Sequence, residues 1–119
     1  VANHQYHTML LALNRTRRAG YRRIGVVLTE GDNDKTEGLW MAGYKAGIHR
    51  MNLPRVVPLL MPVLKADEVV AWVRRQRLDA VISTHDRISV WLNAAGLRVP
   101  DEVGFAHLDW NSARRLPLA

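Results

Sequence analysis

The sequence contains no cysteine, which excludes a disulfide scaffold and thiol chemistry and fits a reducing compartment. No apolar run approaches the ~20 residues that a membrane-spanning helix needs, and the polar start 1–8 does not look like a signal peptide. A glycine-rich phosphate loop is also missing, because the acidic segment 29–34 would repel a phosphate. The chain begins with Val rather than Met, so we expect the natural protein to start further upstream.

Hydrophobic residues and positive charge are both plentiful. Hydrophobic residues make up 48% of the 119 positions, which is enough for the packed core of one domain. The formal net charge is +6, and arginines crowd the segment 15–23. Two interpretations of these arginines stay open: they offset the negative end of a helix dipole, or they contact phosphates. Apart from Tyr21 no aromatic residue lies among them, which disfavours single-stranded nucleic acid as a partner.

The spacing of apolar residues predicts alternating helices and strands. In chain order we expect helix 5–18, strand 24–28, loop 29–34, helix 34–49, strand 55–61, helix 66–77, strand 79–83, helix 88–95 and strand 105–108. Alternating elements of this kind favour an α/β fold with a parallel, doubly wound sheet. Pro58 cannot donate a ladder hydrogen bond, so strand 55–61 belongs at a sheet edge.

Helix boundaries follow from capping residues and glycines. Asp34, with Glu37 three residues later, resembles a capping box at the start of helix 34–49. Gly20 and Gly96 stand where the preceding helices should end. Glycines inside helix 34–49 each cost ~1 kcal/mol against alanine, and we expect close packing against the sheet to be the reason for them. These glycines are Gly38, Gly43 and Gly47.

Polar residues follow the last two predicted strands. Thr84-His85-Asp86 comes directly after strand 79–83, and Asp109 follows strand 105–108. Ligands of parallel α/β sheets bind just outside the carboxyl ends of the strands. We therefore expect His85, Asp86 and Asp109 to lie near one another in a binding site.

Five segments resemble motifs of the lactose-repressor (LacI/GalR) family of transcription regulators, in the same order along the chain. Residues 1–4 (VANH) resemble "V-D-N", and residues 20–26 (GYRRIGV) resemble "G-H-x-x-I-x-x-I". Residues 79–86 (DAVISTHD) resemble "P-D-A-I-x-x-x-N-D". Residues 97–104 (LRVPDEVG) resemble "G-L-x-V-P-x-D-V", the most specific of the motifs, and residues 107–109 (HLD) stand at "G-Y/F-D".

The resemblance implies a periplasmic-binding-protein-like type I fold, in which a small molecule binds between two lobes. The chain matches one lobe, the C-terminal one, so we expect residues 1–119 to form a single α/β lobe. Within it, residues 1–20 are a lead-in helix, residues 21–109 are the core, and residues 110–119 are a tail toward a missing segment. The helix-turn-helix headpiece and most of the N-terminal lobe of the family have no counterpart here.

The resemblance also implies ligand-binding roles at matching positions. Asp109 matches an aspartate that hydrogen-bonds the effector, and Asp86 matches the aspartate that opens the helix after the third strand. His85 stands where an asparagine often contacts the effector, and Thr36 matches a Ser/Thr that faces the cleft. Trp40 departs from the family, which carries a ligand-gripping arginine there. Tryptophan cannot offer a bidentate guanidinium, but it can stack on a sugar or base ring.

Simpler interpretations stand beside these roles. Asp109 could cap the next turn, Asp86 could act only as an N-cap, His85 could be an exposed turn residue, and Trp40 could be core packing. Trp110, next to Asp109, completes the set of ligand-binding candidates. His85, Asp86, His107 and Asp109 match no known metal or acid–base motif, so we expect no catalytic residues, no metal and no cofactor.

The sequence therefore predicts an effector-binding and dimerising domain of a LacI-family transcription regulator, in the cytoplasm. Its effector would be a sugar or a similar small metabolite, and a homodimer is expected from the family. Operator DNA would be bound only through a headpiece outside this chain. The alternative is a solute-binding protein of a sugar transporter, which shares the fold. An enzyme and a membrane partner are not expected.

Overall fold

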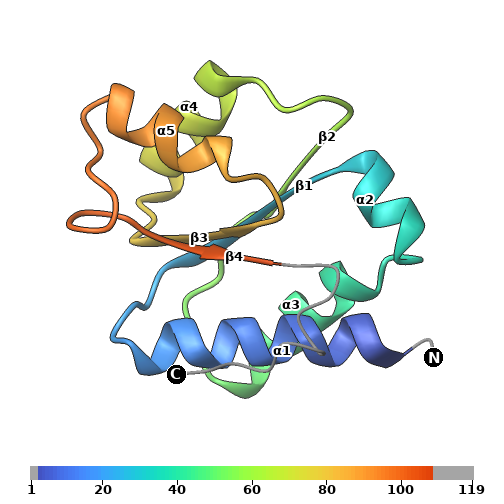
Figure 1. Ribbon diagram of the computed structural model, residues 1–119. Helices are drawn as coiled ribbons and strands as arrows, with labels where there is room; N and C mark the ends of the chain where they lie inside the picture. The colour runs from blue at the N-terminus through green and yellow to red at the C-terminus, as the bar shows by residue number, and fades with distance from the viewer. Residues whose placement is uncertain (1–2, 109–119) are drawn as a thin grey trace.

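Four parallel strands in the order β2-β1-β3-β4 form the centre of the computed structural model, which describes residues 3–108 (Figure 1). The elements in chain order are α1 (Asn3–Arg18), β1 (Ile24–Thr29), α2 (Glu30–Lys35), α3 (Leu39–Arg50), β2 (Leu59–Met61), α4 (Ala66–Gln76), β3 (Ala80–Ser83), α5 (Arg87–Ala94) and β4 (Gly104–His107). The predicted α/β class with a parallel sheet is confirmed.

Helices cover both faces of the sheet, as a doubly wound fold requires (Figure 1). Helices α1 and α3 lie on one face, and α4 and α5 lie on the other. The side chains of β1 alternate between the two layers, with Val26 packed on the α1/α3 side and Val27 packed on the α4/α5 side. Each layer therefore has its own apolar core, and the two cores share the sheet.

Helix α1 belongs to this lobe and is packed into it. Met9 and Leu13 are fully buried in the core that also contains Tyr44 and Ile48 of α3. The helix carries its basic residues in the last turn, as the dipole interpretation predicts, and Gly20 follows with a left-handed φ of 107°. The prediction that Gly20 ends this helix is confirmed.

The glycines of α3 allow α1 to approach closely, and the predicted reason for them was wrong. A Cβ atom on Gly43 would lie 2.6 Å from the backbone oxygen of Tyr6, and one on Gly47 would lie 2.5 Å from a methyl carbon of Leu13. Both neighbours are on α1. The tight contact is therefore between two helices (Figure 1), and the sheet is not the partner.

The segment 29–50 contains two helices, so the single predicted helix 34–49 was wrong. Helix α2 occupies the expected loop, because the Thr29 side chain accepts a hydrogen bond from the Asp32 amide at 3.0 Å and caps it. Glu37 and Gly38 then adopt left-handed φ values of 55° and 74°, which interrupts the helical path between α2 and α3. Asp34 consequently lies inside α2 and is not an N-cap.

The remaining elements follow the predictions, with one shorter strand. Strand β2 covers only Leu59–Met61 of the expected strand 55–61, and it lies at the sheet edge, as predicted from Pro58. Helices α4 and α5 agree with the sequence pattern to within about two residues, and Gly96 follows α5 with a φ of 87°. Within residues 3–108, none of the helices has the length and apolar character needed to cross a bilayer.

Candidate functional site

The candidate site lies at the carboxyl ends of β1 and β3, where the direction of strand progression reverses. From β1 the chain first adds β2 on one side and then returns to add β3 and β4 on the other. In open α/β sheets this switch point leaves a crevice for ligands. The residues that directly follow β1 and β3 are therefore the first to consider.

Asp32 is the central side chain of this site. It lies in the first turn of α2, directly after β1, and the Thr29 cap fixes the direction of that turn. Its side chain is only 14% exposed. A carboxylate in such a position needs donors, and the segment after β3 supplies them.

Thr84 and His85 reach the Asp32 carboxylate across the switch point. The Thr84 hydroxyl donates to Asp32 Oδ2 at 3.0 Å, and His85 Nε2 lies 3.2 Å from the same oxygen. Since an ionised carboxylate only accepts, His85 donates through an Nε2 proton in this contact. The three residues join the first turn of α2 and the segment after β3 into one polar cluster.

His107 and Asp86 extend the cluster toward β4. His107 Nε2 lies 3.1 Å from the Thr84 carbonyl oxygen and 3.6 Å from Asp86 Oδ1. A carbonyl oxygen only accepts, so Nε2 of His107 carries a proton here. The Asp86 side chain is 83% exposed and makes no capping hydrogen bond, although Asp86 occupies the N-cap position of α5. Its carboxylate is therefore available to a ligand.

The cluster offers both hydrogen-bond donors and hydrogen-bond acceptors. We name the five residues Asp32, Thr84, His85, Asp86 and His107 the carboxyl-end cluster. His85 and His107 are 40% and 44% exposed, so their rings are accessible from solvent. Such a set can hold hydroxyl groups of a polar ligand. Within residues 3–108, no group of three or more histidine, aspartate or glutamate side chains is spaced to hold a metal ion.

Two predicted site residues, Thr36 and Trp40, do not join this cluster. The Thr36 side chain is buried, and its hydroxyl donates to the carbonyl oxygens of Asp32 and Asn33, each at 3.1 Å. Trp40, in the first turn of α3, is fully buried in the core that α1 and α3 form against the sheet. The core-packing interpretation of Trp40 fits this environment, and its ligand role stays a prediction.

The structure brings His85 and Asp86 to the same sheet edge, as expected from their place after β3. The predicted ligand roles of Asp109 and Trp110 lie outside the described residues. Asp32 was missed because the sequence was read as a loop there. The available signal was Thr29 followed three residues later by Asp32 directly after a buried strand, which is a helix start.

Comparison with protein families places most of the chain in one of them. Residues 13–115 match the family described as periplasmic binding protein-like domain. No curated protein sequence matches the chain closely enough to count as a relative.

Several solved structures that superpose on this chain are transcription regulators. The chain superposes on the transcription regulator GntR from Chromobacterium violaceum with a TM-score of 0.72 and 18% identity, covering 87% of this chain and 41% of that one. A LacI-family regulator from Enterococcus faecium with bound ribose gives 0.67 and 16%, covering 85% and 40%. A sugar-binding LacI-family regulator from Escherichia coli complexed with phosphate gives 0.69 and 20%, covering 85% and 40%.

These matches confirm the resemblance at the level of the fold. The chain spans less than half the length of the regulators that it matches.

Proposed function

Because the chain belongs to the periplasmic binding protein-like domain family, we propose that it is the effector-binding lobe of a LacI-family transcription regulator. The lobe would contribute one wall of a cleft, and the rest of the full-length protein would supply the second wall and the DNA-reading element. In this proposal the protein is cytoplasmic and forms a homodimer.

The carboxyl-end cluster is the observation that carries this proposal. Five polar side chains meet at the switch point of a parallel sheet, which is where α/β folds bind ligands. Three of them are at least 40% exposed on their side chains: His85, Asp86 and His107. A purely structural cluster would need no such exposure toward the edge of the sheet.

A sugar-like metabolite is the ligand class that the cluster fits best. The cluster presents two carboxylates, a hydroxyl and two imidazoles, which can pair with several hydroxyl groups at once. Similar structures carry bound ribose or phosphate. The two carboxylates at this edge would repel a phosphate, so a neutral polyol ring is favoured over an anion.

A thermal-shift screen of the full-length protein against neutral sugars, sugar phosphates and nucleosides tests the proposal. A ligand at ~100 times its dissociation constant adds about 2.7 kcal/mol of apparent stability. Asp86→Asn and His85→Gln should each reduce the stabilisation, and Asp109→Ala tests the predicted role of that residue. Glu68→Gln, on an exposed turn of α4, is the matched control.

Trp40→Ala is unsuitable for this screen. Removing a buried tryptophan costs about 3–5 kcal/mol of stability by itself, which would mask a lost ligand contact. A panel without any hit, with Asp86→Asn and wild type equally folded, would contradict the ligand-binding role.

The alternative function is a solute-binding protein of a sugar transporter, since that class shares the fold. The two functions differ in whether the full-length protein binds DNA. Electrophoretic mobility shift with the DNA upstream of the gene, at two salt concentrations, separates them. Binding that a hit from the screen weakens or strengthens supports the regulator, whereas no DNA binding at low salt supports the transporter component.

A further inference from the structure

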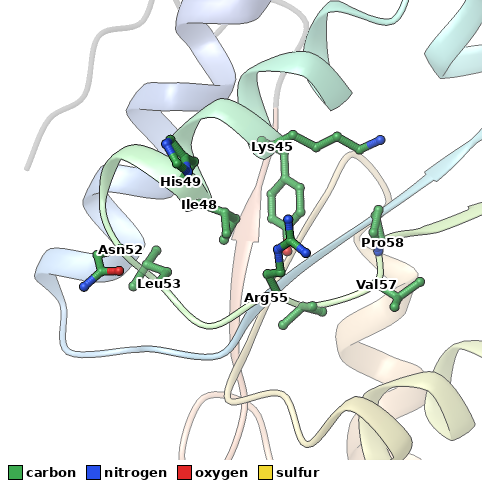
Figure 2. A pocket seen from close by; sticks show the side chains of 10 residues that line it. Lys45, Ile48, His49, Asn52, Leu53, Arg55, Val57 and Pro58 are labelled. Carbon is green, nitrogen blue, oxygen red and sulfur yellow. The ribbon is translucent and has the colours of Figure 1, made fainter.

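A pocket at the opposite end of the sheet from the carboxyl-end cluster is not explained by the proposed function. It has a volume of about 630 Å³, within the roughly 300–1,000 Å³ of small-ligand sites. Its 10 lining residues come from α3 and from the segment that leads into β2 (Figure 2). Helix α3 runs back from the carboxyl ends of the strands, so its last turns lie near their amino ends.

The walls of this pocket, which we name the α3–β2 pocket, are held in place by the backbone. Asn52 adopts a left-handed φ of 54°, and the Leu53 amide donates to the Ile48 carbonyl oxygen at 3.0 Å, so the chain turns sharply after α3. On the other wall, Trp72 Nε1 donates to the Val57 carbonyl oxygen at 2.7 Å. A pocket with fixed walls needs little ordering when a ligand binds.

The floor of the pocket is apolar. Tyr44, Ile48, Leu53 and Val56 line it, and each is at most 8% exposed. The Tyr44 hydroxyl already donates to the Ile24 carbonyl oxygen at 2.6 Å, so its ring offers apolar surface and no available donor. A ligand in this pocket therefore needs an apolar body.

The rim of the pocket is positively charged. The two cations that line it are Lys45 on α3 and Arg55 on the opposite segment, and Figure 2 shows Ile48 between His49 and Arg55. None of the lining residues is acidic, and within residues 3–108 neither Lys45 nor Arg55 forms a salt bridge. The negative dipole end of α3 opposes an anion, but its last carbonyl groups are already paired with the amides of Met51, Asn52 and Leu53.

We propose that the α3–β2 pocket binds a second small molecule, an aromatic or aliphatic anion whose apolar body rests on Ile48 and Val56 and whose carboxylate meets Lys45 and Arg55. Its charge requirement is opposite to that of the carboxyl-end cluster, which presents carboxylates. The two sites would therefore take different ligands.

Two probes of the same shape test this proposal on the full-length protein: indole-3-carboxylate and neutral indole-3-carboxamide. By calorimetric titration the carboxylate should bind more tightly, and its affinity should fall as salt rises. Lys45→Gln and Arg55→Gln should each weaken it about two- to fivefold, the range of exposed charge pairs. Arg75→Gln, which removes another exposed cation, on α4, should leave it unchanged.

Acetylation of lysines with acetic anhydride locates the bound probe. The carboxylate should protect Lys45 from acetylation, while Lys35 and Lys65 react as before. Equal affinity for both probes, the absence of binding, unprotected Lys45, or an equal loss in Arg75→Gln would each overturn the proposal. None of these outcomes depends on the sugar-binding proposal, because the carboxyl-end cluster contains none of the residues tested here.

Discussion

The ionisation of Tyr44 is coupled to folding. Its hydroxyl donates to the Ile24 carbonyl oxygen inside the core, and burial raises the pKa of Tyr44 well above its ordinary value of 10.0, against the opposing charge of Arg23. The unfolded chain loses this proton near pH 10, whereas the folded chain retains it. The contribution to stability is therefore present below pH 10 and is lost as the pH rises further.

Tyr44→Phe should show both effects in urea unfolding. At pH 7 the variant should lose about 1–3 kcal/mol of unfolding free energy, because the Ile24 carbonyl oxygen is left without its donor. Between roughly pH 9 and 11 its stability should fall less steeply than that of wild type, because the raised pKa is gone. Tyr6→Phe is the control and should keep the wild-type slope. An unchanged slope in Tyr44→Phe would contradict this account.

At the same scale, the sequence could predict which residues gather at the site but not how they pair. His85 and Asp86 follow directly from their place after a buried strand. Asp32 could not be placed, because the acidic segment 29–34 lacks apolar periodicity and looks like a loop until the Thr29 cap is recognised. For Trp40 the sequence left core packing and ligand contact open, because its burial depends on a partner helix that is distant in the sequence.

At the scale of elements, the contact between α1 and α3 should decide the effect of glycine substitutions. Gly43→Ala would gain about 1 kcal/mol of helix propensity, but its Cβ would lie 2.6 Å from the Tyr6 carbonyl oxygen, a backbone atom that cannot turn away. We expect a net loss of stability in thermal unfolding. Gly31→Ala in α2 is the matched comparison, since the nearest atom lies at 3.8 Å, and it should be neutral or stabilising. Stabilisation by Gly43→Ala would show that α1 is not packed this tightly.

Most elements could be predicted because their apolar periodicity is strong. The observed bounds of the buried strands β1 and β3 and of the amphipathic helix α4 agree closely with the predicted ones. The break between α2 and α3 could not be predicted, because it depends on the left-handed backbone of Glu37 and Gly38. Residues other than glycine, such as glutamate, rarely adopt that conformation. Strand β2 is shorter than expected because Pro58 precedes it and its pairing with β1 covers only three residue pairs.

At the scale of the whole molecule, the open edge of β2 is a candidate surface for association with a second chain. Of the large apolar side chains that are exposed within residues 3–108, three lie on or beside this strand, namely Val57, Leu60 and Val63. The outer side of β2 also has no neighbouring strand in the described sheet. Apolar side chains next to an unpaired strand edge favour association. This edge is therefore our candidate for the contact between two copies in the proposed homodimer.

Leu60→Lys combined with Val63→Lys should weaken that homodimer in sedimentation of the full-length protein. The two side chains are 40% and 67% exposed in the single chain, so the change should leave the folded lobe intact. Each would lose up to about 1.5–3 kcal/mol of apolar burial at the interface, so the dissociation constant should rise at least tenfold. Leu11→Lys, at a similarly exposed position on α1, is the control and should leave the dimer unchanged. A dimer that is equally stable in both variants would move the interface to another face.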